Sequence, residues 1–274
     1  MKLGILGGGQ LGRMLLQAAG NYTLETFVLE NDPTCPAAHL CHHFTLGDIR
    51  DYDTVYAFGK QVEVLTIEIE NINIDALFQL QKEGIKVIPS PEAIAIIKDK
   101  GIQKQFYADN NIPTAPFLLT DDKTAIEANG DFLPAANKLR TGGYDGKGVE
   151  LLFGADDLLR AFTEPSLLEK MVNIKKEIAV LVGVGLDGTT VVYSPTEMVF
   201  DPKLNLVDYL IAPADISAEQ IKTVETIALQ AVKALQSPGL FAVELFLSTN
   251  DEILVNEIAP RAHNSGHQTI EGNL

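Results

Sequence analysis

Several residue types that mark particular protein classes are scarce in this sequence. Its 274 residues contain two cysteines and no tryptophan, and the cysteines have no framework spacing, which argues against a secreted protein built on disulfides. No apolar run reaches the roughly 20 residues that a membrane span requires. The chain also begins directly with strand-like residues rather than with a signal peptide. These absences predict a cytoplasmic protein with no membrane partner.

Basic residues are also few. The chain has 21 lysines and arginines against 37 aspartates and glutamates, a formal net charge of −16, which disfavours a nucleic-acid partner because such binding relies on basic surface. An anionic small molecule is not excluded, but its site must gather lysines, arginines or helix N-termini locally. What the chain does have is a hydrophobic content of 46%, which suits a globular protein with a sizeable core.

The stretch from Gly239 to His267 contains the residues that most strongly indicate a functional site. It begins as two apolar runs around a polar tip, which predicts an antiparallel hairpin. A two-residue turn at 250–251 would place Glu244 directly opposite Glu257, on one face of the sheet. Two such carboxylates repel each other, and a magnesium ion would relieve the repulsion, with Asn256 as a further oxygen ligand. The alternative is a pair of glutamates on a solvated sheet face.

The loop that follows, residues 259–267, is polar and dense in side-chain donors. Its arginine, histidines, asparagine and serine suit an anionic ligand beside the metal. The alternative is a loop whose donors satisfy one another.

The N-terminal strand, Lys2 to Leu6, runs into a glycine-rich turn and then a helix. Gly7, Gly9 and Gly12 satisfy Gly-x-Gly-x-x-Gly in the strand–turn–helix context that this motif requires. Glu30 ends the second strand, where a dinucleotide fold holds a ribose. A nicotinamide-dependent oxidoreductase is therefore one candidate, although the same turn can bind any phosphate or let a helix pack closely on a strand.

Acidic residues follow the strand predicted at Val64 to Ile67. Glu68 and Glu70 alternate at its C-terminal end, where open α/β sheets bind ligands, although a solvated edge has the same pattern. Alternating strands and helices up to Ile88 predict a small parallel-sheet domain. The cysteines and histidines between Cys35 and His43 match no standard zinc spacing, so we expect a loop and the start of a third strand there.

A helical linker comes next. Ser90 and Pro91 supply an N-cap and a first-turn proline. They start the helical segment that carries Lys98 and Lys100 and ends near residue 115.

A second glycine-rich loop lies between two short strands in the following region. Residues 138–148 contain four glycines together with the cations Lys138, Arg140 and Lys147, which predicts a mobile flap over phosphate groups. No Gly-Lys-Ser/Thr is present, so the loop is not a Walker P-loop. The alternative is an ordinary flexible hairpin. The rest of this half mixes helices with antiparallel strands, an α+β pattern.

Five blocks of the sequence, taken together, resemble one family. That family is the 5-(carboxyamino)imidazole ribonucleotide synthases, ATP-dependent enzymes of purine biosynthesis in the ATP-grasp superfamily. The blocks are Gly-Gly-Gln-Leu-Gly-Arg-Met (8–14), Glu-Ile-Glu-Asn (68–71), Arg-Thr-Gly-Gly-Tyr-Asp-Gly-Lys-Gly (140–148), Asn-Glu-Ile-Ala-Pro-Arg (256–261) and His-Asn-Ser-Gly-His (263–267).

The resemblance implies a fold that combines α/β and α+β parts. A Rossmann-like preATP-grasp domain would cover residues 1–90 and the helical linker residues 91–115. A small lid subdomain of an ATP-grasp fold would cover 116–185 and its large subdomain 186–274. The family normally continues beyond this point into a C-terminal domain, so on this reading the large subdomain is incomplete and that domain is missing.

The resemblance also implies a ligase reaction in IMP biosynthesis. ATP would phosphorylate bicarbonate to carboxyphosphate, which would carboxylate the exocyclic amine of aminoimidazole ribonucleotide. ADP and phosphate would leave. The implied cofactors and substrates are ATP with Mg²⁺, bicarbonate and the ribonucleotide, and the implied assembly is a homodimer.

Site residues are carried over position by position. The ATP-binding set would be Lys100, Lys138, Gly143, Tyr144, Asp145, Gly146, Lys147, Gly148, Glu169, Lys170, Met171, Val172, Glu177, Asn256 and Glu257. The metal ligands would be Glu244 and Glu257. The ribonucleotide side would hold Gln10, Glu68, Glu70, His263, Asn264 and Ser265, and the catalytic residues would be Tyr144, Asp145 and Arg261, with Asp145 orienting or deprotonating the attacking amine.

Three features depart from the family pattern. Phe200 stands where relatives often carry a nucleotide-contacting histidine, Gln268 replaces an aromatic residue, and the sequence stops at Leu274. Three other functions stay open at this point. One is a different ATP-grasp carboxylate–amine ligase of purine metabolism, another is the nicotinamide-dependent oxidoreductase, and the third is a nucleotide-binding protein without turnover.

Overall fold

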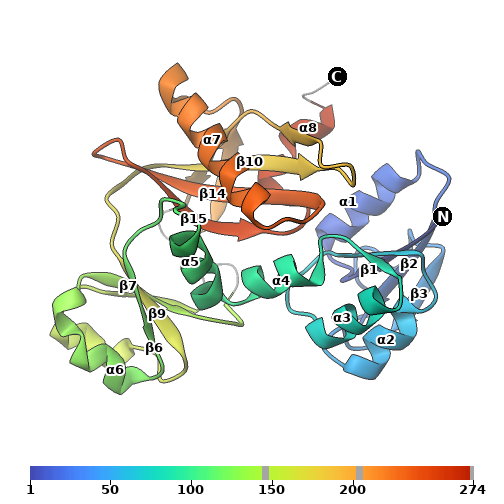
Figure 1. The fold of residues 1–274 in the computed structure, drawn as a ribbon, viewed down its shortest axis with the longest axis horizontal. Coiled ribbons are helices and arrows are strands. Elements are labelled where there is room, and N and C mark those ends of the chain that lie inside the picture. The colour runs from blue at the N-terminus through green and yellow to red at the C-terminus, as the bar shows by residue number, and fades with distance from the viewer. Residues whose placement is uncertain (144–147, 202–205, 272–274) are drawn as a thin grey trace.

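The chain forms three β-sheets joined by a helical linker (Figure 1). The computed structural model describes residues 1–143, 148–201 and 206–271. We refer to the sheets as the N-terminal sheet (β1–β5), the lid sheet (β6–β9) and the large sheet (β10–β15). No helix within the described ranges combines the length and the apolar character needed to cross a membrane.

The N-terminal sheet is parallel throughout, with strand order β3-β2-β1-β4-β5. Ile5 and Val28 pack beside Leu16 on one face, whereas Leu6 and Leu29 belong to the cluster on the other face. Because both faces are buried, the strands read as near-continuous apolar runs, and the predicted parallel-sheet domain is confirmed. Its elements are β1 (Lys2–Leu6), α1 (Gln10–Ala19), β2 (Glu25–Glu30), β3 (His43–Leu46), α2 (Tyr52–Gly59), β4 (Val64–Ile67), α3 (Ile74–Lys82) and β5 (Lys86–Val87).

The predicted linker consists of two helices, α4 (Pro91–Lys98) and α5 (Lys100–Asp109). Ser90 caps the first helix as predicted. Asp99 has an extended backbone, and its carboxylate accepts N–H groups from the first turn of α5, so it separates the two helices. Tyr107 of α5 is fully buried in the core beneath the large sheet, which anchors the helix between the lid sheet and the large sheet (Figure 1).

The lid sheet is a four-stranded antiparallel sheet with strand order β6-β9-β7-β8. Its elements are β6 (Phe117–Thr120), α6 (Lys123–Ala128), the 3₁₀ helix η1 (Gly130–Phe132), β7 (Ala135–Leu139), β8 (Val149–Leu152), the 3₁₀ helix η2 (Ala155–Arg160) and β9 (Ser166–Lys170). The sequence of residues 155–162 favours an α-helix, but the structure has a shorter 3₁₀ segment there. A small core around Ile126 and Leu168 holds α6 on the sheet.

The large sheet has strand order β13-β12-β10-β14-β15, with β11 paired to β10. Helix α7 covers one face of this sheet, and its Ser217 N-cap forms a capping box with Gln220. The elements are β10 (Ile174–Val184), β11 (Thr190–Val192), β12 (Thr196–Phe200), β13 (Val207–Ile211), α7 (Ala218–Ala234), β14 (Gly239–Ser248), β15 (Ile253–Ala259), η3 (Asn264–Gly266) and α8 (Gln268–Glu271). Strand β10 pairs with β14 along its length, so it belongs to the large sheet although the expected lid range, 116–185, includes it.

Candidate active site

The β14–β15 hairpin brings two carboxylates together. The expected two-residue turn is wrong, because Ser248 N–H donates to the Glu252 carbonyl at 2.9 Å and closes a three-residue loop, in which Asp251 has a φ of 60°. This loop alone would shift the pairing by one residue. A β-bulge restores the predicted register. Leu245 of β14 faces Val255 of β15, and the next residue along, Glu244, faces Glu257, so that Asn256 has no partner of its own.

The bulge also explains why two successive side chains of β15 face the site. Val255 and Ile258 are both buried in the core under α7. The two residues between them therefore share the opposite face, where strict alternation would allow only one. Those residues are Asn256 and Glu257, and each contacts a lysine from another element. The predicted oxygen-rich hairpin is thus built by an irregularity in the strand.

Each of the two carboxylates has a cationic or ionisable partner. The Lys100 ammonium forms an ion pair with Glu257, and His263 Nε2 lies 3.2 Å from Glu244 Oε1. The charge of Lys100 holds the pKa of Glu257 below its ordinary value, in spite of burial. In return, the charge of Glu257 raises the pKa of Lys100. These partners relieve the repulsion between the carboxylates that the sequence predicted.

The donor set suits a magnesium ion that arrives with a phosphate. Glu244, Glu257 and the amide oxygen of Asn256 are hard oxygen ligands, and Mg²⁺ commonly takes one or two carboxylates plus substrate phosphates. Within the described residues, no group of three or more His, Cys, Asp or Glu side chains forms a ready-made metal cage. The pair therefore fits a shared protein–phosphate site rather than a closed structural one.

A second charged cluster adjoins the first through the contact between Lys138 and Asn256. It includes Lys104, which the sequence analysis did not assign to the site. Glu169 Oε2 of β9 is 3.4 Å from Lys138 Nζ and 2.9 Å from Lys104 Nζ. Lys138 also donates to Asn256 Oδ1 at 3.0 Å. Burial raises the pKa of Glu169, but Lys138 and Lys104 outweigh it and hold that pKa below its ordinary value. Lys104 follows Lys100 by one helical turn, and that spacing was the available signal.

Glu177 of β10 is a further carboxylate, and its surroundings disfavour the charged form. It lies two residues from Ala179, which is directly opposite Glu244 in the neighbouring strand, so Glu177 and Glu244 face the same side of the sheet. Burial, with the charge of Glu244, raises the pKa of Glu177 to about 7. A carboxylate in that state favours hydrogen bonds from a ligand's hydroxyl groups.

The segment expected to meet adenine continues from Glu169. Its next residue, Lys170, donates from the backbone to the Pro116 carbonyl at 2.9 Å and places its ammonium 4.9 Å from the Phe132 ring centroid. Met171 N–H lies 3.4 Å from the Pro134 carbonyl, and Val172 follows in the connection to β10. The Lys170 ammonium and the backbone N–H groups of Lys170 and Met171 are thus all engaged within the lid.

The glycine-rich turn after β1 holds protein carboxylates. Gly12 N–H donates to Glu68 Oε1 at 3.3 Å, and Gly8 N–H donates to Glu30 Oε2 at 3.0 Å. A Cβ on Gly9 would lie 2.5 Å from Glu68 Oε1. Burial raises the pKa of Glu68. A carboxylate thus occupies the α1 N-terminus where a pyrophosphate would bind, which argues against the nicotinamide-dependent alternative.

The residues predicted for the ribonucleotide meet where the N-terminal sheet approaches the end of β15. Arg261 Nε donates to Glu70 Oε1 at 2.8 Å, and His263 Nδ1 lies 2.8 Å from Ser265 Oγ. Glu68 and Arg261 also line a small cavity of about 110 Å³. Two further predicted residues, Gln10 of α1 and Asn264 of η3, are exposed at the starts of their helices.

The predicted flap is described only at its two ends. Tyr144, Asp145, Gly146 and Lys147 lie outside the described residues. At the base, Leu139 N–H donates to the Gly148 carbonyl at 2.9 Å. Gly148 has a φ of +83°, and a Cβ there would lie 3.0 Å from the Gly143 Cα. The two ends of the loop are therefore pressed together, as a hairpin-like flap requires.

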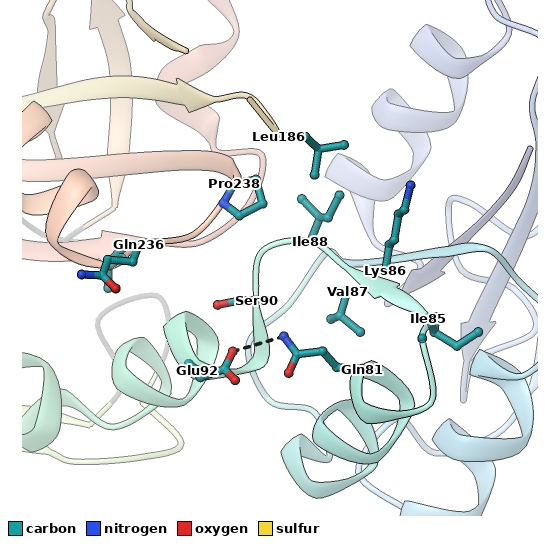
Figure 2. Close-up of a pocket in the computed structure, with 12 residues that line it drawn as sticks. Gln81, Ile85, Lys86, Val87, Ile88, Ser90, Glu92, Leu186, Gln236 and Pro238 are labelled. Carbon is teal, nitrogen blue, oxygen red and sulfur yellow. Dashed lines mark hydrogen bonds between the residues drawn. The ribbon is translucent and has the colours of Figure 1, made fainter. Parts of the chain in front are cut away.

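A cavity larger than the one beside Arg261 lies elsewhere in the described part of the chain. Figure 2 shows this cavity of about 620 Å³ between β5–α4 and the segment that joins α7 to β14. Gln81 donates to Glu92 across one wall at 3.3 Å, and Ile88 and Leu186 line another part. None of the predicted site residues lines this cavity, so the volume of the cavity does not identify the functional site.

Comparison with known proteins matches both halves of the chain. The family model of the ribonucleotide synthetase preATP-grasp domain matches residues 1–98, and that of the ATP-grasp domain matches residues 105–274. The N5-carboxyaminoimidazole ribonucleotide synthase of Brucella melitensis is 34% identical, over 97% of this chain and 75% of that protein. The chloroplastic phosphoribosylaminoimidazole carboxylase of Vigna aconitifolia is 38% identical, over 98% of this chain and 49% of that protein.

Solved structures give the same picture. N5-carboxyaminoimidazole ribonucleotide synthetase from Thermotoga maritima superposes with a TM-score of 0.89 at 37% identity, over 98% of this chain and 71% of that chain. Carboxyaminoimidazole ribonucleotide synthase from Aspergillus clavatus, solved with ATP, superposes with a TM-score of 0.93 at 33% identity, over 98% and 72%. The chain spans about half the length of the plant and yeast carboxylases that it matches.

Proposed function

The chain belongs to the ATP-grasp family, among the N5-carboxyaminoimidazole ribonucleotide synthases, and on this premise we propose that it carboxylates 5-aminoimidazole ribonucleotide with bicarbonate at the expense of ATP. One convergence supports the proposal most. Three separate elements supply two contacts beside Glu244, one between Lys100 and Glu257 and one between Lys138 and Asn256. Lysines and hard oxygen ligands in one place suit a magnesium-bound triphosphate.

In the proposed first step, a bicarbonate oxygen attacks the γ-phosphorus of ATP, the bond to the β,γ-bridging oxygen breaks, and ADP leaves. Such transfers depend on positioning and on charge neutralisation. Lys100 and Lys138 neutralise phosphate oxygens, and Glu244, Glu257 and Asn256 hold the metal. Bound Mg²⁺ supplies further neutralisation of the phosphates. When the nucleotide arrives, Lys100 exchanges its contact with Glu257 for one with phosphate.

The remaining nucleotide contacts follow from the arrangement of β9 and β10. The backbone from Glu169 to Val172 meets the adenine, and Glu177 accepts hydrogen bonds from the ribose hydroxyls. The flap from Gly143 to Gly148 closes over the phosphates. Its closure excludes water from the carboxyphosphate, which water would otherwise hydrolyse.

In the proposed second step, the exocyclic amine of the ribonucleotide attacks the carboxyl carbon of carboxyphosphate, or carbon dioxide released from it, and phosphate leaves. The ribonucleotide lies at the rim formed by Gln10, Glu68, Glu70, Asn264 and the Arg261–Ser265 loop. This rim is at the carboxyl end of β4, where open α/β sheets bind ligands, and the Arg261–Glu70 ion pair lies there. Tyr144 orients the ribonucleotide, and Asp145 receives the proton that the amine loses.

The test is ADP release by this chain with Mg²⁺ and ATP, in the presence and absence of bicarbonate and 5-aminoimidazole ribonucleotide. Release that depends on the ribonucleotide supports the proposal. If release is absent, the change in melting temperature with Mg²⁺–ATP separates two outcomes. A rise indicates a nucleotide-binding protein without turnover, and no rise contradicts the proposal.

We further propose that the protein acts as a homodimer in the cytoplasm. The family resemblance supports the dimer, and the supply of ATP and ribonucleotides there supports the compartment. Sedimentation equilibrium checks the first part, and fractionation of the source cells checks the second.

A further inference from the structure

Lys104 of α5 is a buried cation with an unusual set of partners. Its side chain is 4% exposed. The ammonium lies 2.9 Å from Glu169 Oε2, 2.6 Å from Thr114 Oγ1 and 3.3 Å from the Val255 carbonyl. An ammonium has three donors, so all three are used, and none is left for a ligand. Lys104 therefore acts through its neighbours.

Those three acceptors belong to different parts of the fold. Glu169 is on β9 of the lid sheet, Val255 is on β15 of the large sheet, and Thr114 lies in the segment that leads from α5 to the lid. The Thr114 hydroxyl also donates to the Val255 carbonyl at 2.7 Å. Lys104 thus joins the lid sheet to the large sheet at the point where β15 bulges toward the site.

Gln103, the neighbour of Lys104, holds the other side of the same bulge. Its Oε1 accepts the Ile258 N–H at 3.2 Å, and its Nε2 lies 3.5 Å from the Ile258 carbonyl. Val255 and Ile258 flank the two bulged residues. Two successive side chains of α5 therefore cover the outer edge of β15 on either side of the bulge.

These contacts form a closed ring of two lysines, one glutamate, an asparagine side chain and a backbone carbonyl. Lys104 contacts Glu169, Glu169 contacts Lys138, and Lys138 contacts Asn256, whose neighbour Val255 contacts Lys104 again. Glu169 is thus shared between two ammonium groups. Without Lys104, a carboxylate that is 3% exposed would have Lys138 as its remaining cation, and the cost of burying an unpaired charge would draw Lys138 toward it.

We propose that Lys104 is a positioning residue for nucleotide binding, which neutralises Glu169 from behind and so leaves Lys138 free to contact phosphate. The inference rests on the proposed function, because it requires a nucleotide at Lys138. It predicts that the charge of Glu169 is harmful to nucleotide binding when Lys104 is absent. A role of Lys104 in packing alone carries no such prediction.

The test is a double-mutant cycle on the Kd for Mg²⁺–ATP, measured by titration calorimetry. Lys104→Met weakens binding about tenfold, the equivalent of one lost charge contact of about 1.4 kcal/mol. Adding Glu169→Gln to Lys104→Met restores most of this loss, because Lys138 is no longer captured. The matched control is Lys98→Met, which removes a partly buried ammonium that donates to the Ile72 carbonyl in the N-terminal domain, and it leaves the Kd for Mg²⁺–ATP unchanged.

Each outcome decides between the two proposals. If the unaltered chain binds no Mg²⁺–ATP, both fail. If it binds and Lys104→Met binds equally well, or if the double variant is no better than Lys104→Met, the inference alone fails. Should Lys104→Met be too unstable to titrate, Lys104→Gln takes its place with the same expectations, because its amide retains donors for Thr114 and Val255.

Discussion

Glu244 and Glu257 lie directly opposite each other on β14 and β15, although the loop between the strands is one residue longer than that pairing requires. The extra residue is compensated by the bulge at Asn256. The bulge does more than restore the register, since it turns both Asn256 and Glu257 toward Lys138 and Lys100. The proposed oxygen ligands and the lysines proposed to bind phosphate are therefore placed together by a single irregularity.

Removal of the charge at Glu257 tests the metal assignment. Glu257→Gln keeps the shape of the side chain and removes one anionic ligand, so we expect the Mg²⁺ concentration for half-maximal ADP release to rise about tenfold or more. Glu252→Gln, at an exposed position in the same hairpin, is the control and should leave the Mg²⁺ dependence unchanged. An unchanged dependence in Glu257→Gln would exclude Glu257 as a metal ligand.

Glu177 predicts a pH dependence of stability. Its pKa is raised to about 7 in the folded chain, so between the ordinary value near 4.5 and about pH 7 the folded state binds more protons than the unfolded state. The stabilisation is fully present below pH 4.5 and is lost as pH rises through 7. Relative to Glu177→Gln, the unaltered chain should lose stability on the order of 1 kcal/mol across this window, after allowance for solvent screening.

Urea unfolding at several pH values checks this difference. Glu127→Gln, an exposed position on α6, is the control and should follow the unaltered chain. A constant difference between the unaltered chain and Glu177→Gln over pH 5 to 8 would contradict the expectation.

The Arg261–Glu70 pair predicts a selective effect on the ribonucleotide. Arg261→Lys keeps the charge but loses the planar fork, so we expect KM for the ribonucleotide to rise about tenfold while KM for ATP stays within about twofold. Arg160→Lys, which alters a surface ion pair in the lid, should change neither constant. Equal rises in both constants would indicate a general loss of structure instead.

Gly148 tests the base of the flap. Its φ of +83° and the 3.0 Å approach of a Cβ to the Gly143 Cα both oppose a larger residue, so Gly148→Ala should lower the free energy of unfolding by about 1–2 kcal/mol and raise KM for ATP. Gly154→Ala is the control, because it has open space within 4 Å and an extended φ of −167°. Equal effects of the two substitutions would show that the flap base has no special requirement.

Local patterns in the sequence were sufficient for much of the fold. Alternating apolar strands and helices predicted the parallel N-terminal sheet, and the Ser90–Pro91 pair predicted the start of α4. These features depend on interactions within a few residues. The facing of Glu244 and Glu257 was also predicted, but through a turn that the structure does not contain.

What the sequence by itself determined is therefore many of the elements, the family resemblance and the residue types available to the site. The tertiary structure decided which charges meet. Lys104 pairs with Glu169 because α5 packs between two sheets. Strand β10 belongs to the large sheet because it pairs with β14 along its whole length. Glu68 accepts a hydrogen bond at the α1 N-terminus because β4 lies beside β1. Each of these contacts joins residues far apart in the chain, and only the packing of whole elements brings such residues together.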